Sequence, residues 1–177
     1  MFIDKIPAKL ENNAFNVIIE ISMNDKPVKY EFDKEIGALR VDRFMQVSMS
    51  YPCNYGFIPH TLSQDGDPAD VLVLTQYPVI PGAIITARPV GVLVMEDESG
   101  IDEKILAVPT HQVDITFSDI LDIEDVPQII KDRINHFFEY YKKLENGKWV
   151  KIDGWKNAQE ARSLIEGAIH RANATIL

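Results

Sequence analysis

The class of fold follows from two stretches, Phe15-Asn-Val-Ile-Ile-Glu-Ile-Ser22 and Val28-Lys-Tyr-Glu-Phe-Asp33. In the first, apolar residues recur at every second position, which predicts a strand with at least one buried face. In the second, apolar and charged side chains alternate without interruption, so we expect Lys29 and Glu31 on one polar face. A turn at residues 24–27 separates them. The amino-terminal part of the chain is therefore predicted to be β structure.

The remaining sequence predicts more strands followed by two helices. Further strands are expected at residues 39–44, 71–74, 84–95, 105–108 and 149–152. A first helix is expected after a cap at Asp125 and before a turn at Asn146-Gly147, with the apolar stripe Ile130, Ile134, Phe137 and Tyr141. A second is expected after a cap at Asn157, with the stripe Ala161, Leu164, Ile165, Ala168, Ile169 and Ala172. This order predicts a mainly-β α+β domain, in which an antiparallel barrel or sheet is covered by helices.

Length and composition indicate an ordinary globular protein. The 177 residues suit a single domain over 1–177, and 46% are apolar. A net charge of −9 argues against a nucleic-acid or anionic-membrane surface. Cys53 is the only cysteine, so an intrachain disulfide is excluded and a buried thiol is expected. Without a signal-peptide pattern or a transmembrane stretch, the protein is expected to be cytoplasmic.

Acidic residues gather in two short segments. Asp65-Gly-Asp-Pro-Ala-Asp70 holds three carboxylates in six residues, and Glu96–Glu103 forms a second cluster. Each segment alone is also typical of a solvated turn. Both lie at strand ends, so a barrel would bring the aspartates together, where like charges coexist only with bound cations. Magnesium fits a site made of Asp65, Asp67, Asp70, Asp97 and Asp102.

Basic and phenolic residues complete the pattern. Taken singly, Lys29, Arg43, Lys104 and Lys142 are typical of solvated side chains, and Tyr141 is typical of a core position. Together with divalent metals they suit an oligophosphate, because Arg and Lys neutralise the phosphoryl oxygens that metals leave uncovered.

Several motifs resemble one family over nearly the whole chain: family I soluble inorganic pyrophosphatases of the bacterial type. The resemblance is carried by Tyr30-Glu31, Val41-Asp-Arg43-Phe, Tyr51-Pro-Cys-Asn-Tyr55-Gly-Phe, the Asp65–Asp70 segment, Ile105-Leu-Ala-Val-Pro109 and His136-Phe-Phe-Glu-Tyr-Tyr-Lys142. Ala69 departs from the family, which usually has a larger aliphatic residue there. The change is expected to affect local packing more than metal ligation.

The resemblance implies hydrolysis of pyrophosphate to two phosphates, which keeps phosphate-releasing biosynthesis irreversible, on an OB-like five-stranded antiparallel barrel with two flanking helices. It implies several Mg²⁺ ions, with Mn²⁺ or Zn²⁺ as substitutes. It assigns the tight metal pair to Asp65, Asp70 and Asp102, a substrate-associated metal to Asp97 and Asp102, and the general base to Asp67. It makes Glu20 and Glu31 outer carboxylates of the metal site. The implied phosphate contacts are Lys29, Arg43, Tyr55, Lys104, Tyr141 and Lys142.

Assembly is the last expectation from the sequence. Ile129, Arg133, His136 and Tyr140 form a second stripe on the first helix, which is also compatible with a solvated face. The family resembled here is typically a homohexamer with contacts through this helix. We therefore expect His136 near a subunit interface, where its protonation would weaken assembly.

Three other functions remain open from the sequence. A metal-dependent phosphohydrolase of nucleotides or polyphosphate would use the same carboxylates but also a base pocket, for which Phe57, Tyr77 or Trp155 could stack. A non-enzymatic OB-type nucleic-acid module would need a basic groove, which the negative charge disfavours. A catalytically silent relative would be expected to lack some metal-site carboxylates, and all are present.

Overall fold

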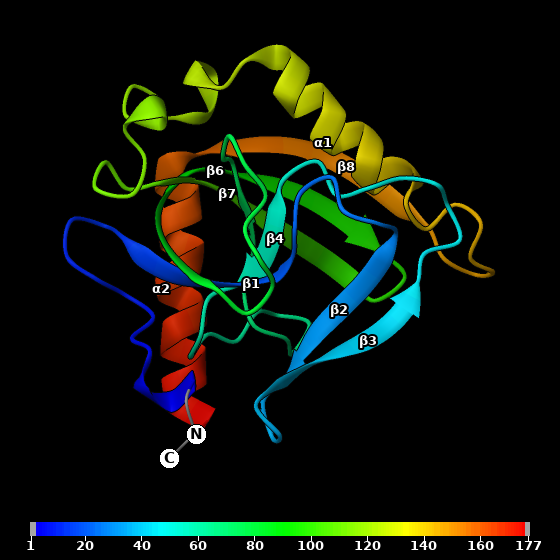
Figure 1. Ribbon diagram of the computed structural model, residues 1–177, viewed down its shortest axis with the longest axis horizontal. Helices are drawn as coiled ribbons and strands as arrows, with labels where there is room; N and C mark the ends of the chain where they lie inside the picture. The colour runs from blue at the N-terminus through cyan, green and yellow to red at the C-terminus, as the bar shows by residue number, and fades with distance from the viewer. Residues whose placement is uncertain (1–2, 176–177) are drawn as a thin grey trace.

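The computed structural model describes residues 3–175, and Figure 1 shows the arrangement of its elements. Its strands are β1 (Phe15–Ile21), β2 (Val28–Asp33), β3 (Ala38–Phe44), β4 (Asn54–Phe57), β5 (Asp70–Val73), β6 (Ile84–Asp97), β7 (Gly100–Pro109) and β8 (Val150–Asn157). Its helices are α1 (Gln128–Tyr140) and α2 (Ala158–Thr175), with 3₁₀ turns η1 (Ile3–Lys5), η2 (Ile115–Phe117) and η3 (Ile123–Asp125).

Five strands close into a barrel. The pairing runs β1–β4–β5–β7–β6 and returns to β1, which confirms the OB-like ring predicted from the sequence. The predicted antiparallel order is wrong for one pair, because β5 and β7 run parallel with Asp70 opposite Lys104. Strand β8 extends the sheet beyond β6, and β2 and β3 form a separate hairpin that projects beside the barrel (Figure 1).

The barrel strands are buried on both faces. Alternate residues of β5 divide between two apolar clusters: Leu72 packs in the cluster that includes Phe137 of α1, and Val71 in the one that includes Ile165 of α2. Strand β1 is buried at every position, so it has two buried faces where the alternation required only one. The helices are therefore placed by the two apolar faces that the strand pattern creates.

Several boundaries differ from the sequence prediction. Asp125 does not cap α1; its carboxylate accepts the N–H groups of Leu121 and Asp122 in the preceding 3₁₀ turn, and Pro127 precedes the helix. Helix α1 ends at Tyr140, so the turn at residues 146–147 does not terminate it. The cap at Asn157 is confirmed, because its Oδ1 accepts the Glu160 N–H at 2.9 Å. Strands β7 and β8 are longer than predicted.

Strand β4 was missed because it is short and contains Gly56. A Cβ at Gly56 would lie 1.9 Å from the Ile18 carbonyl oxygen of β1, so only glycine permits this close strand contact. Cys53, just before β4, is buried as predicted, and burial raises the pKa of its thiol to about 12. Among residues 3–175, no helix combines the length and apolar character needed to cross a bilayer.

Candidate active site

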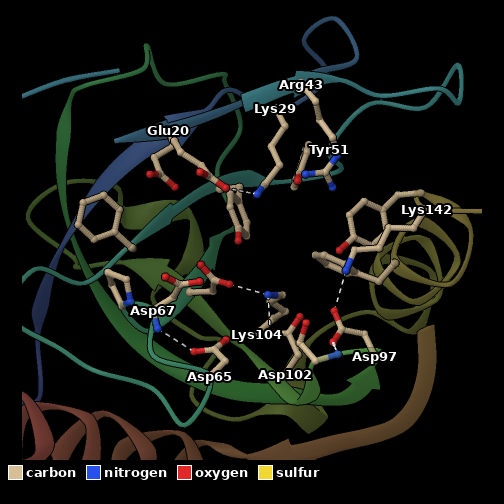
Figure 2. A pocket seen from close by; sticks show the side chains of 18 of the residues that line it. Glu20, Lys29, Arg43, Tyr51, Asp65, Asp67, Asp97, Asp102, Lys104 and Lys142 are labelled. Atoms are coloured by element: carbon tan, nitrogen blue, oxygen red, sulfur yellow. Dashed lines mark hydrogen bonds and ion pairs between the residues drawn. The ribbon is translucent and has the colours of Figure 1, made fainter. Parts of the chain in front are cut away.

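One end of the barrel, the β2–β3 hairpin and the segment after α1 enclose a cavity of about 500 Å³ (Figure 2). It is rich in charge. The cavity is lined by eight carboxylates, Glu20, Glu31, Asp65, Asp67, Asp70, Asp97, Glu98 and Asp102, and by six cations, Lys29, Lys34, Arg43, Lys104, Lys142 and Lys148. All thirteen residues named from the sequence as metal, base or phosphate positions line this cavity.

The conformation of the Asp65–Asp70 loop is set by a glycine and by a hydrogen bond within the loop. Gly66 has a φ of 93°, which favours glycine, and the Asp67 N–H donates to Asp65 Oδ1 at 3.0 Å. The Asp67 carboxylate accepts no hydrogen bond from residues 3–175. Burial raises its pKa, and the charges of Asp65 and Asp70 raise it further. Asp67 is thus a carboxylate with a proton affinity above the usual and no protein donor to satisfy it.

Lys104 lies between two of the other aspartates. Its Nζ donates to Asp70 and to Asp102 Oδ1, the latter at 2.6 Å, and the residue is only 5% exposed. Burial acts against the charged form, but the charges of Asp70 and Asp102 hold the pKa of Lys104 well above its usual range. The parallel pairing of β5 with β7 sets this contact, since it places Asp70 directly beside Lys104.

A second group of charges joins the β6–β7 turn to the segment after α1. Lys142 Nζ donates to Asp97 Oδ2 at 2.6 Å and lies 3.6 Å from Glu98, which also binds Lys148. Although burial opposes ionisation, the contact with Lys148 and the charge of Lys142 lower the pKa of Glu98 to about 2. Glu98 and Lys148 were not singled out from the sequence. The acidic cluster contained the signal for Glu98, but nothing local marked Lys148.

The hairpin contributes cations from the opposite side. Lys29 and Arg43 are paired in the β2–β3 register, so both lie at the same end of the hairpin. Lys29 contacts Glu31, as the shared face predicted, and lies 3.3 Å from Asp42. In Figure 2, Lys29 and Arg43 face Lys104 and Asp102 across the cavity. An anion with two phosphoryl groups that binds here would contact cationic side chains on two sides of the cavity.

Three tyrosines line the cavity beside the charged residues. Burial raises the pKa of Tyr51, Tyr55 and Tyr141, so all three keep their protons and can donate hydrogen bonds. The Tyr51 ring packs at a tilt against Tyr55, at a centroid distance of 5.0 Å, and against Phe137 of α1, at 4.5 Å. Tyr51 was not assigned a role from the sequence, although it begins the motif that contains Tyr55.

Glu20 lies under the hairpin, where its Oε1 accepts the Phe32 N–H at 2.6 Å. Burial raises its pKa from 4.5 to about 8, against the lowering effect of that hydrogen bond. In the unfolded chain this carboxyl loses its proton near pH 4.5, but in the folded protein it keeps the proton up to about pH 8. The folded state therefore binds more protons within this window, and stability falls as pH rises through it.

We expect Glu20→Gln to remove this fall in stability with rising pH. Between pH 6 and 7, the free energy of unfolding of the metal-free protein should fall by up to about 1.4 kcal/mol more in the unsubstituted chain than in the variant. Urea unfolding in the presence of a chelator measures both. Glutamine keeps the oxygen that accepts the Phe32 N–H, so the hydrogen bond is conserved. An equal loss in the two proteins would contradict a raised pKa at Glu20.

The donor chemistry of the cavity fits divalent metal ions. Its potential metal ligands are all carboxylates, which suits hard cations. Within residues 3–175, no three such groups converge into a ready-made metal cluster, and three of the aspartates, Asp70, Asp102 and Asp97, pair with lysines. Carboxyl groups nevertheless outnumber cations by eight to six, and still by seven to six when Glu20 keeps its proton, so an added phosphate anion requires added positive charge. The residues therefore fit cations that arrive with a phosphate substrate.

The family model for inorganic pyrophosphatase matches residues 17–173. The chain belongs to the inorganic pyrophosphatase family. An inorganic pyrophosphatase of Rickettsia bellii is 66% identical over 171 residues, which cover 97% of this chain and 98% of the relative. The structure of an inorganic pyrophosphatase from Coxiella burnetii has a TM-score of 0.91 at 51% identity, covering 94% of this chain and 99% of that one. That from Thermus thermophilus has a TM-score of 0.90 at 42% identity, covering 95% and 97%.

These similarities place the chain in family I, bacterial type, and its activity is the hydrolysis of inorganic pyrophosphate. Members of this family are generally metal-dependent. In this pyrophosphatase, Ala69 is 4% exposed and its N–H donates to Thr61 Oγ1 at 2.9 Å. The small side chain at this position therefore packs in an apolar cluster and does not line the cavity.

Proposed function

We propose that this cavity is where the chain hydrolyses pyrophosphate, and that its two sets of cations bind the two phosphoryl groups. The observation that carries the proposal is the placement of Lys29 and Arg43 on the hairpin side and of Lys104 and Lys142 on the barrel side of one acidic cavity (Figure 2). Tyr55 and Tyr141 add protonated phenols as hydrogen-bond donors to phosphoryl oxygens.

The carboxylates would hold Mg²⁺, or Mn²⁺ or Zn²⁺ in its place. Asp65, Asp70 and Asp102 are proposed for the tight pair and Asp97 with Asp102 for the ion that accompanies the substrate, with Glu20 and Glu31 as outer carboxylates. When bound, the cations would lower the pKa of the attacking water and neutralise the charge of the substrate. Lys104 would then share Asp70 and Asp102 with them, which frees its ammonium for a phosphoryl oxygen.

Asp67 is proposed to accept the proton of the attacking water. Its carboxylate borders the cavity, accepts no hydrogen bond from residues 3–175 and has a raised pKa. A base in such a position can take a proton or orient the nucleophile toward phosphorus. The Lys and Arg side chains across the cavity would stabilise the negative charge that develops on the leaving phosphate.

Phosphate release from the purified protein tests this function. We expect rapid release from pyrophosphate with Mg²⁺, little release with a chelator, and little release from ATP under the same conditions. Comparable rates with ATP would indicate a broader phosphohydrolase. No release with any of the three metals would contradict hydrolysis in this cavity.

We further infer that residues 1–177 act as one domain and assemble as a homohexamer through α1. Ile129 is 57% exposed, and the His136 ring packs at a tilt against Tyr140 at a centroid distance of 4.9 Å. These side chains share an outer stripe of α1, away from the buried Ile134 and Phe137. Sedimentation at neutral pH and micromolar concentration should give a hexamer, and a monomer would contradict the assembly.

A further inference from the structure

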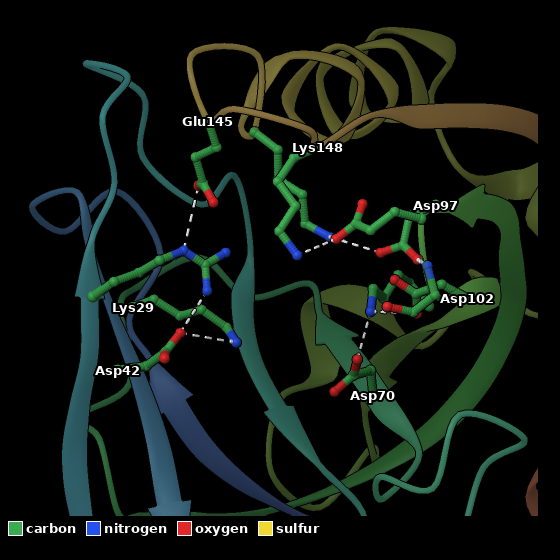
Figure 3. A network of polar contacts seen from close by, with 12 residues as sticks. Lys29, Asp42, Asp70, Asp97, Asp102, Glu145 and Lys148 are labelled. Atoms are coloured by element: carbon green, nitrogen blue, oxygen red, sulfur yellow. Dashed lines mark hydrogen bonds and ion pairs between the residues drawn. The ribbon is translucent and has the colours of Figure 1, made fainter.

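Glu145 faces Arg43 from outside the lining of the cavity. It lies in the segment between α1 and β8, and its Oε1 accepts the Arg43 Nε–H at 3.3 Å (Figure 3). The Glu145 side chain is 12% exposed and that of Arg43 is 31% exposed. The ion pair therefore connects the hairpin to the segment after α1, in surroundings that are partly shielded from water.

The segment that carries Glu145 is held independently of Arg43. Lys142 binds Asp97 and Lys148 binds Glu98, so both sides of the turn are fixed to the β6–β7 end of the barrel. Within the turn, the Glu145 N–H donates to the Lys142 carbonyl at 2.9 Å. Glu145 is thus held in place by its own segment, and the longer side chain of Arg43 adopts the orientation that reaches it.

The contacts of Arg43 leave most of its donors free for a ligand. Nε donates to Glu145, and one N–H of Nη1 donates to Asp42 Oδ2 at 2.5 Å. The other three of its five N–H groups have no acceptor within residues 3–175. Because the guanidinium is planar and rigid, acceptors on two of its nitrogens fix the direction of the third.

We propose that Glu145 is a positioning residue that holds the Arg43 guanidinium in the orientation needed to bind a phosphoryl oxygen of pyrophosphate. This inference rests on the proposed role of Arg43 as a phosphate contact. Glu145 does not line the cavity, so the proposal gives it no direct contact with the substrate. Its effect is to order Arg43 before binding, which lowers the entropy lost when the complex forms.

Steady-state kinetics with Glu145→Ala and Glu145→Gln test the proposal. We expect Glu145→Ala to raise KM for magnesium pyrophosphate about threefold to tenfold, the effect of ordering one long side chain on binding. Turnover at saturation should change less than KM. Glu145→Gln keeps an oxygen for the Arg43 Nε–H and should restore most of the affinity. Glu160→Ala removes an exposed carboxylate from α2 and serves as the control for net charge.

The Arg43→Ala background separates this inference from the proposed function. There, Glu145→Ala should cause no further rise in KM, because the side chain it positions is gone. A full additional rise would show that Glu145 acts through another group and would overturn the inference. A lower KM in Glu145→Ala would show that Glu145 competes with the substrate for Arg43, which also overturns it. If Arg43→Ala itself leaves KM unchanged, the proposed contact between Arg43 and phosphate is wrong, and the inference about Glu145 falls with it.

Discussion

Asp67→Asn is expected to lower kcat for pyrophosphate by about 10²- to 10⁴-fold, the range in which general bases contribute. The amide keeps the size of the carboxylate but cannot accept the proton of the attacking water. The Asp67 side chain accepts no hydrogen bond from residues 3–175, so the loss should reflect chemistry and not a broken contact. Phosphate release at saturating pyrophosphate and Mg²⁺ measures kcat.

Metal binding distinguishes this role from ligation. Titration calorimetry with Mg²⁺ should give nearly the same affinity for Asp67→Asn and the unsubstituted protein. Asp119→Asn makes the same change on an exposed carboxylate outside the cavity and should keep full turnover. Full turnover in Asp67→Asn would remove Asp67 as the base, and a large loss of Mg²⁺ affinity would make it a metal ligand instead.

Lys104→Met is expected to lower the free energy of unfolding by about 3–5 kcal/mol without metal, because it leaves two carboxylates without their buried partner. Methionine fills a similar length, so the change mainly removes the charge shared by Asp70 and Asp102. Divalent cations can replace that charge, and saturating Mg²⁺ should therefore restore part of the stability. Urea unfolding with chelator and with Mg²⁺ gives both values.

Lys151→Met provides the matched control. Lys151 also pairs with an aspartate from a strand, Asp153 at 2.9 Å, but the two side chains are 64% and 44% exposed. Its loss should change stability far less than Lys104→Met does, because water screens exposed pairs. A similarly small loss in Lys104→Met, or a loss that Mg²⁺ leaves unchanged, would contradict the central place of Lys104 among the carboxylates.

Much of the local structure was predictable because it depends on neighbouring residues. The alternation at 15–22 and 28–33 gave β1 and β2, and the helical stripe gave the buried face of α1 at Ile134 and Phe137. The Asp65–Asp70 loop was equally clear, since Gly66 and Pro68 exclude regular structure there. One error was also local: the Asp125 carboxylate could accept N–H groups of either α1 or the preceding turn, and it accepts those of Leu121 and Asp122.

Most of the composition of the site could be predicted from the sequence, apart from residues such as Tyr51, Glu98 and Lys148, but its internal connections could not. Lys104 beside Asp70 requires the parallel β5–β7 pair, and Arg43 on Glu145 joins residues 102 positions apart. No short-range pattern records these contacts, because they depend on how the ring closes and where α1 packs. The residue order alone was enough to place most strands, the buried faces of the helices and thirteen of the charged and phenolic cavity residues. Which charges are buried together depended on the fold, because long-range packing sets their distances and their shielding from water.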